Sequence, residues 1–516
     1  MMQRLWQRLV HFCTFVVYFL VHCMHPAVDM WRVWRSGFEW RSTLHRLYVD
    51  TTNRPPRAGT AAAASGGEGG SELAFDPMVD FATVVGSTTG VGFEVAAGLA
   101  ACGLSVIAGM RGSPERLSDV SLRLAERALA LRQEHGIGQR LPAPAIIPLH
   151  VDVADFTSGA KFAAAVAHIL RDGDATQSIG AAPSSRVRDC SVSATPRGRS
   201  ASASARRATL SGSSNNNSNS STKQTERRRL LRVALLNAAV LMTDFERTPQ
   251  GFEAQVAINA LGHIVIAEHL LQLGVFGRPV GGAAPSSPSD AECRLIFTSS
   301  SGARVGDPLR GTFVHGNELI PGATCQFQMY GDSKALIASY AKLLHTRVVR
   351  AMLDGVGPRL SVRAYHPGCI ASNIVLDSGM YAAAVLAWLQ RTIGVAIGAM
   401  VTAERASVYV MRMCVGSGGR LVFVPPGDAR RNASATAGKC ASPKLAVARP
   451  ESHPGVLTRA EIVSGEEEHF FSYLHEFDPL TMARFLRNEQ TLKLVHDRVT
   501  HDLAVYLPEK KSVLDT

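Results

Sequence analysis

The stretch Phe81-Ala82-Thr83-Val84-Val85-Gly86-Ser87-Thr88-Thr89-Gly90-Val91-Gly92 decides the fold of this chain. Its first five residues are apolar or β-branched, which predicts a buried strand, and residues 93–100 predict a helix. A glycine turn between a strand and a helix N-terminus lets backbone N–H groups approach an anion that the helix dipole also favours. We therefore interpret the segment from Gly86 to Gly92 as a phosphate-binding loop for a dinucleotide, with an ordinary turn as the alternative.

Strand-like and helix-like segments alternate along the rest of the chain. Helices are predicted at residues 115–134, from 156, at 249–273, from 330, within 381–415 and at 477–505. Further strands are predicted at residues 104–111, 145–153, 232–239, 294–298, 360–365 and 420–424. This alternation predicts an α/β fold, a Rossmann-type doubly wound parallel sheet of about seven strands, which binds its ligands at the carboxyl ends of the strands.

The charge of the chain lies mostly outside the predicted sheet. The 516 residues carry a formal net charge of +11, which ordinarily suggests nucleic acid or an anionic membrane as a partner. Residues 1–60 carry +5 and residues 171–232 carry +8, so the remainder sums to −2. We therefore expect no nucleic-acid surface. Nine scattered cysteines without a CxxC pair predict free thiols in a reducing compartment and no metal site.

The first 50 residues predict a membrane anchor or a targeting segment. Residues 9–24 form an apolar run that would reach about 24 Å as a helix, and Trp31, Trp34 and Trp40 follow it with neighbouring arginines. We expect a retained anchor, with an organelle presequence as the alternative. Beyond it, residues 51–75 are expected to be a flexible linker, 76–505 a folded domain, 171–232 a low-complexity disordered insertion within that domain, and 506–516 a tail.

The residue that ends the second predicted strand bears on the choice of cofactor. Dinucleotide folds that bind NAD tend to place an acid about 20 residues beyond the glycines, whereas a cation there suits the 2′-phosphate of NADP. Arg111 stands at that point, so NADP(H) is favoured and NAD(H) stays open; a solvated surface arginine is the alternative. Asp152 and Val153, at the end of the third strand, are expected to contact the adenine, although Asp152 could instead cap the helix from Phe156.

Tyr330 and Lys334 are expected to share one face of a helix, because they are four residues apart in Tyr330-Gly331-Asp332-Ser333-Lys334. A neighbouring ammonium stabilises a phenolate and lowers the pKa of the tyrosine, which a phenol needs for proton exchange near neutral pH. An ordinary amphipathic helix is the alternative interpretation of this pair.

Six motifs in order resemble the short-chain dehydrogenase/reductase family over about residues 78–505. The retinol-dehydrogenase-like branch is the most similar. The motifs are Gly86-x-x-x-Gly90-x-Gly92, Asn237-Ala238, Asn259, Ser300, Tyr330-x-x-Ser333-Lys334 and Pro367-Gly368. Two departures are Val85, where the family usually has threonine, and Ala239, where it usually has glycine.

The resemblance implies a role for each matching residue. Tyr330 would be the general acid or base, and Lys334 would lower its pKa and bind the nicotinamide ribose. Ser300 would hold the substrate oxygen, and Asn259 would organise a water that reprotonates Lys334. Asn237, Ala238, Pro367 and Gly368 would contact the cofactor.

The implied function is an NAD(P)-dependent oxidoreductase acting on a lipophilic alcohol or carbonyl of the retinoid, steroid or fatty-aldehyde class. Members of this branch often act from a membrane anchor, so the expected site is the endoplasmic reticulum with the catalytic domain facing the cytosol, or alternatively the mitochondrion. A homodimer is typical of the family. The alternative function is a catalytically weak nucleotide-binding scaffold that acts through its basic insertion.

Overall fold

A computed structural model describes residues 40–52, 75, 78–138, 141–172, 229–241, 243, 246–277, 293–304, 306–310, 326–353, 357–376, 383–396, 400–415, 471–472, 486 and 488–508. The apolar run at 9–24, Trp31, Trp34, most of the linker and the insertion from 173 to 228 lie outside these residues. So does the strand expected at 420–424. The expectations for these segments stay predictions.

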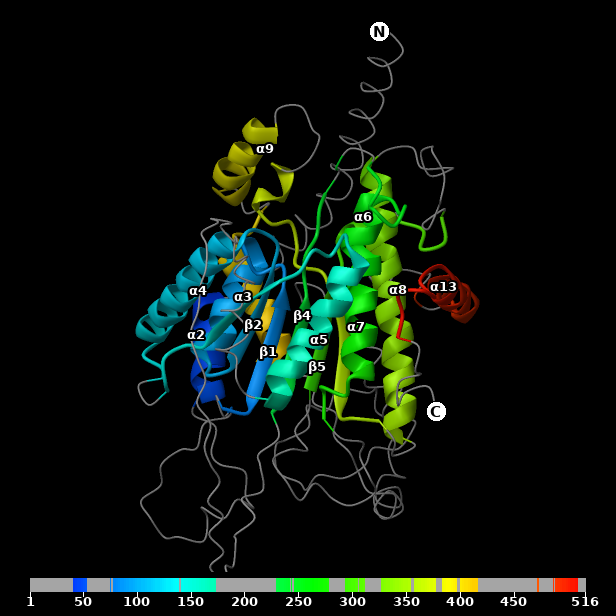
Figure 1. The fold of residues 1–516 in the computed structure, drawn as a ribbon. Helices are drawn as coiled ribbons and strands as arrows, with labels where there is room; N and C mark the ends of the chain where they lie inside the picture. Colours follow the sequence, from blue (N-terminus) through cyan, green and yellow to red (C-terminus); the bar gives the residue numbers. More distant parts are fainter. Residues whose placement is uncertain are drawn as a thin grey trace, which may run out of the picture. The chain divides into compact units, whose positions relative to one another are not determined.

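A parallel sheet of seven strands forms the centre of the fold, in the order β3-β2-β1-β4-β5-β6-β7 (Figure 1). The order turns back between β1 and β4, which is the arrangement of a doubly wound sheet. The seventh strand is Phe471–Ser472, so it is a different segment from the one expected at 420–424. The other strands are β1 (Asp80–Val85), β2 (Ser105–Met110), β3 (Ile146–His150), β4 (Leu230–Leu236), β5 (Cys293–Thr298) and β6 (Leu360–Tyr365).

Helices cover both faces of this sheet (Figure 1). On one face, α3 (Gly90–Ala101), α4 (Pro114–His135) and α10 (Ala403–Val415) pack together over one buried cluster. On the other face, α5 (Phe156–Asp172), α7 (Gly262–Gln272) and α8 (Gln326–Leu353) share a second cluster, joined by α13 (Glu489–Asp502). Two apolar layers enclose the sheet, which fits strands that are buried on both sides, as the near-continuous apolar composition of β1 predicts.

The folded domain begins earlier than the sequence indicated. Helix α2 (Trp40–Thr52) packs against α10, with Leu44 and Tyr48 buried in the cluster around α3. Trp40 also packs against that cluster rather than serving as a membrane-interface anchor. The boundary at residue 50 was therefore wrong, because apolar side chains from a segment rich in tryptophan and arginine are used in the core.

The helix expected at 249–273 is broken near its middle. It consists of α6 (Ala254–Val256), the π-helical turn η2 (Ala257–Leu261) and α7. Among the described residues, only this stretch from Ala254 to Gln272 is long and apolar enough to cross a membrane, and 78% of its most apolar window is buried within the protein. It is therefore a core helix.

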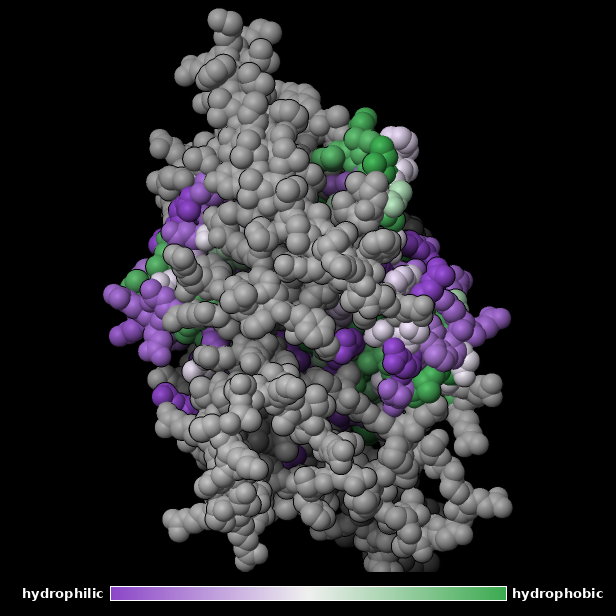
Figure 2. Space-filling model, turned by 180° about the vertical axis from the view of Figure 1, so that it is seen from behind, coloured by the Kyte–Doolittle hydropathy of each residue, from purple (hydrophilic) through white to green (hydrophobic). Residues whose placement is uncertain are grey.

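A small helical unit lies beyond the carboxyl ends of the strands. It consists of α9 (Ala383–Leu389) and the π turn η6 (Gln390–Gly394), within the segment 381–415 for which helices were predicted. Val385, Trp388 and Ile393 are each more than half exposed on its outer side. Figure 2, which is turned by 180° from Figure 1, shows hydrophobic surface at the upper right, where α9 lies. We call α9 and η6 together the lid.

Candidate active site

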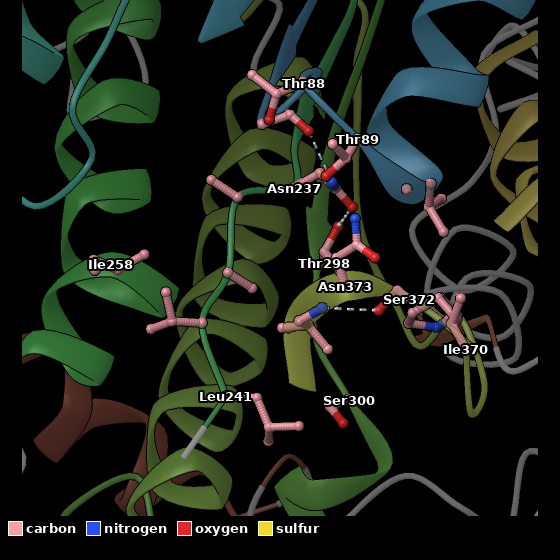
Figure 3. Close-up of a pocket in the computed structure, with 18 of the residues that line it drawn as sticks. Thr88, Thr89, Asn237, Leu241, Ile258, Thr298, Ser300, Ile370, Ser372 and Asn373 are labelled. Atoms are coloured by element: carbon pink, nitrogen blue, oxygen red, sulfur yellow. Dashed lines mark hydrogen bonds between the residues drawn. The ribbon is translucent and has the colours of Figure 1, made fainter. Parts of the chain in front are cut away.

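One cavity of about 580 Å³ opens at the carboxyl ends of the strands. It extends from the glycine loop, where Thr88 and Thr89 lie, to Ser300 and Leu241 at its other end (Figure 3). Polar groups gather along the sheet edge, and apolar side chains line the wall near the lid. The predicted site residues that line it are Gly86, Thr88, Thr89, Gly90, Val91, Arg111, Asp152, Val153, Asn237, Ala238, Ser300, Tyr330, Lys334, Pro367 and Gly368.

The glycine loop has the conformation that only glycine adopts easily. Gly86 and Gly90 have φ angles of 85° and 68°. A Cβ on Gly92 would lie 2.1 Å from the carbonyl oxygen of Gly86, so the helix can approach the loop only because Gly92 has no side chain. Ser87 and Gly92 are buried behind the loop and do not line the cavity.

The N-terminus of α3 has the features of an anion site. Its N-cap residue, Thr89, makes no side-chain hydrogen bond to the helix, and the first turn contains no acidic residue. The first backbone N–H groups of a helix need an outside acceptor, and the helix dipole favours a negative one. The residues present therefore fit the pyrophosphate of a dinucleotide.

Asn237 connects the ends of several strands beneath the cavity. Its Nδ2 donates to the carbonyl oxygen of Gly86 at 3.4 Å, and its Oδ1 lies 3.1 Å from both Thr298 Oγ1 and Tyr365 Oη. Thr298 Oγ1 in turn lies 2.8 Å from Tyr365 Oη. This network ties the glycine loop to β5 and β6. Thr298 and Tyr365 were not found from the sequence, because their role depends on three strand ends meeting.

Tyr330 and Ser300 face each other in the cavity. Burial raises the pKa of Tyr330 to about 12, and a hydrogen bond with Ser300 only partly offsets this rise. The Ser300 hydroxyl also accepts a hydrogen bond from the backbone N–H of Gly302 at 3.2 Å, which fixes its position. A substrate oxygen placed between the two hydroxyl groups would meet two hydrogen-bond donors.

Lys334 lies beneath the ring of Tyr330, 5.8 Å from its centroid, and donates from Nζ to the carbonyl oxygen of Thr298 at 3.1 Å. Burial lowers the pKa of Lys334 to about 7. The expected lowering of the pKa of Tyr330 by Lys334 is therefore not seen. Burial disfavours both the Tyr330 phenolate and the Lys334 ammonium. The ammonium was expected to stabilise the phenolate, but burial destabilises the ammonium itself.

Asn259 lies in the π turn η2 and does not line the cavity. Its Oδ1 accepts from the N–H of Val240 at 2.8 Å, and its Nδ2 lies 3.0 Å from both the Val240 carbonyl oxygen and Ser333 Oγ. Its side chain therefore bonds to protein groups, and the role expected of Asn259 in organising a water for Lys334 stays a prediction. It holds Val240, which lines the cavity, against the helix that carries Tyr330.

Two arginines lie at the adenosine end of the cavity, one expected and one not. Arg111 follows β2, and Arg116 lies in the first turn of α4; both line the cavity and both are exposed. The sequence offered one signal for Arg116: it lies five residues after Arg111, just beyond Ser113, the N-cap of α4. Asp152 also lines the cavity, and its Oδ1 accepts from Ala154 N at 3.0 Å. Asp155, not Asp152, accepts from Thr157 N at the start of α5, so the capping alternative for Asp152 was wrong.

Comparison with curated proteins finds retinol dehydrogenases and other short-chain dehydrogenases among the similar sequences. No family model matches the chain. It is 28% identical to retinol dehydrogenase 12 of Mus musculus over 148 residues, covering 29% of this chain and 39% of the relative. It is 26% identical to short-chain dehydrogenase TIC 32 A, chloroplastic, of Brassica napus over 150 residues, covering 29% and 42%. The chain thus spans about two fifths of the length of these curated relatives.

Among solved structures, a short-chain dehydrogenase of Burkholderia cenocepacia in complex with NADP has a TM-score of 0.37 and 16% identity, covering 67% of this chain and 94% of that chain. The site motifs and the curated relatives point to one class of dehydrogenases with a doubly wound sheet. The chain is similar to the short-chain dehydrogenase/reductase family, and some of these relatives are retinol dehydrogenases.

Proposed function

We propose that this protein is an NAD(P)-dependent oxidoreductase that transfers a hydride between a nicotinamide cofactor and a lipophilic alcohol or carbonyl compound. The observation that carries the proposal is a single cavity that contains the glycine loop, Ser300, Tyr330 and Lys334. A dinucleotide along the sheet edge and a substrate oxygen at Tyr330 would use all of these groups together.

In this mechanism the glycine loop and the N-terminus of α3 hold the pyrophosphate, and Asn237 keeps the loop in place. The bound nicotinamide supplies or accepts the hydride. Ser300 orients the substrate oxygen and stabilises the charge that develops on it. In reduction, Tyr330 Oη gives its proton to that oxygen while the carbonyl carbon gains the hydride; in oxidation both transfers run in reverse. Lys334 lies next to the ring that carries the resulting charge.

A preference for NADP(H) over NAD(H) is part of the proposal. Arg111 and Arg116 supply two guanidinium groups to one end of the cavity, and guanidinium groups match phosphate geometry. The capping segment between them contains one acid, Glu115, which hydrogen-bonds to Ser113. Two cations at this end support binding of a 2′-phosphate.

A lipophilic substrate and a membrane location are also proposed. Ile374, Leu376, Leu386 and Met400 form an apolar wall of the cavity. The outer side of the lid, with Val385, Trp388 and Ile393, is exposed next to that wall. These features and the apolar run at residues 9–24 support loading of an apolar molecule close to a lipid surface, with the endoplasmic reticulum as the proposed site.

The test of the proposed function uses the full chain in detergent or lipid. We expect NADPH fluorescence to shift on binding and NADPH to be consumed with an aldehyde, retinoid, steroid or 3-ketoacyl panel. Tyr330→Phe should retain the fluorescence shift and lose at least about a hundredfold in turnover, because it removes the proton donor and little volume. Failure of the wild type to bind either nicotinamide nucleotide would overturn the proposal.

A further inference from the structure

The lid carries one polar side chain in an otherwise apolar part of the cavity wall. Leu386 and Gln390 are four residues apart, so they share the inner face of the lid, and both line the cavity. Met400, which packs against Gly394 at the end of the lid, lines the same wall. The amide of Gln390 therefore shares this part of the cavity wall with apolar side chains.

Gln390 is buried, with 8% of its surface exposed, and within the described part of the chain its Oε1 has no hydrogen-bond partner. A buried amide oxygen left unpaired is costly, by about 1 to 3 kcal/mol in typical proteins. Two polar side chains that line the same cavity have other partners: Asn373 Oδ1 accepts from Arg391, and Ser372 Oγ accepts from Ile374 N. The amide is thus available to a bound molecule.

Backbone hydrogen bonds connect the lid to the segment after β6, which carries Cys369. Cys369, which lies close enough to affect the pKa of Tyr330, accepts from Val401 N at 2.8 Å. Met400 N in turn donates to the carbonyl oxygen of Gly394 at 2.9 Å. Gly394 is the last residue of the π turn η6, and Gln390 is the first. Single π turns inside helices frequently occur at functional sites, because they redirect one side chain.

We propose that the amide of Gln390 binds a hydroxyl group on the substrate, at a distance from the carbon that reacts. The preferred substrate is then a lipophilic alcohol or carbonyl compound that carries a second, uncharged hydroxyl. A hydroxyl group both donates and accepts, so it satisfies the amide in either orientation of its oxygen and nitrogen. This inference rests on the proposed function and names the substrate class of the same site.

The test compares straight-chain aldehydes of about eight to twelve carbons with the same aldehydes carrying a terminal hydroxyl, in the full-length protein with NADPH. Varying the chain length moves the hydroxyl along the cavity. For at least one length we expect the wild type to prefer the hydroxylated aldehyde about tenfold or more in kcat/KM, because an unpaired buried group rejects the analogue that lacks its partner.

Gln390→Met removes the amide and keeps the side-chain length, so this preference should fall about tenfold, mostly through KM. Leu386→Met is the matched control, since it alters the neighbouring inner-face position without a polar group, and it should keep the preference. Gln390→Leu repeats the test if the methionine variant is unstable. The melting temperature and the Kd for NADPH are measured for every variant.

Three results would overturn the inference. The first is a wild type that shows no preference at any chain length, and the second is a Gln390→Met variant that keeps the preference. The third is a Gln390→Met variant that weakens NADPH binding while the substrate ratio stays the same, which would assign the amide to the carboxamide of the cofactor. A wild type that turns over neither aldehyde and binds no NADPH would instead refute the proposed function, and this inference with it.

Discussion

Asn259 donates a hydrogen bond from Nδ2 to Ser333 Oγ at 3.0 Å, joining the π turn η2 to the catalytic helix between Tyr330 and Lys334. Ser333 Oγ itself donates to the carbonyl oxygen of Tyr330 at 2.7 Å. One buried amide thus connects the loop after β4 with the backbone of the tyrosine.

Asn259→Ala should destabilise the protein strongly. Asn259 is fully buried, and its loss would leave the N–H and the C=O of the half-buried Val240 without their partner, so the free energy of unfolding should fall by about 2 to 4 kcal/mol. Asn259→Asp keeps the acceptor for the Val240 N–H, so its free energy of unfolding should lie between those of the wild type and the alanine variant. Denaturant unfolding measures both variants; a loss below about 0.5 kcal/mol for the alanine variant would contradict this role.

Gly90→Ala and Gly92→Ala should differ, although the two positions are two residues apart. A Cβ on Gly90 meets nothing within 4 Å, but its φ of 68° should cost about 1 kcal/mol in unfolding free energy. A Cβ on Gly92 would collide with the Gly86 carbonyl, so that variant should lose several-fold more stability and also bind NADPH weakly. Thermal unfolding and NADPH titration test this order, and equal effects would speak against the close approach.

Arg111→Gln and Arg116→Gln should each reduce the preference for NADPH over NADH by about tenfold, because each removes a charge-assisted hydrogen bond to a phosphate. Arg123→Gln is the control: it lies farther along α4, where its guanidinium packs over Phe93, outside the cavity lining. Kd values for the two nucleotides provide the ratio. If the arginine variants lower both affinities equally, neither side chain contacts the 2′-phosphate.

Ser300→Ala should lower kcat by about a hundredfold to a thousandfold, the usual loss when one donor to a developing oxyanion is removed. The Kd for NADPH should stay near the wild-type value, because the hydroxyl is expected to contact substrate rather than cofactor. Single-turnover reduction with a fixed aldehyde measures the effect. A change confined to the NADPH Kd would assign Ser300 to the cofactor.

The two reaction directions should depend differently on pH. With a pKa raised to about 12, Tyr330 is protonated near neutrality, which is the form that reduction requires. Oxidation requires the deprotonated form, whose fraction grows about tenfold per pH unit below the pKa. Reduction should therefore vary little and oxidation should increase between about pH 6 and pH 10. An oxidation rate that levels off near pH 7 would show that the bound cofactor lowers this pKa strongly.

Much of the fold could be predicted from local patterns. The apolar strand, glycine turn and helix around Gly86 are local features, and their order along the chain specifies a doubly wound sheet. Segments with mixed signals were harder to interpret: α2 combines tryptophan and arginine with residues that are buried in the core, and β7 is only two residues long. Neither carries a periodic pattern long enough to separate it from its surroundings.

Residue types and their order predicted that Ser300, Tyr330 and Lys334 act together, and all three line one cavity. Their roles in the reaction stay predictions. The direction of the Tyr330 pKa shift was wrong, because desolvation depends on how deeply two side chains are buried, and sequence spacing carries no information about that. Arg116 was missed although it lies only five residues after Arg111, whereas Gln390 reaches the cavity only through the path of a distant backbone segment.

The sequence by itself therefore determined the alternation of strands and helices from β1 to β6 and the glycine loop, since these depend on neighbours along the chain. Only the tertiary structure decided that the Asn259 side chain binds Val240 and Ser333, that burial opposes both charges of the Tyr330 and Lys334 pair, and that the lid brings Gln390 to the cavity. Those outcomes depend on contacts between segments far apart in sequence, where packing and desolvation, rather than local propensity, set the energies.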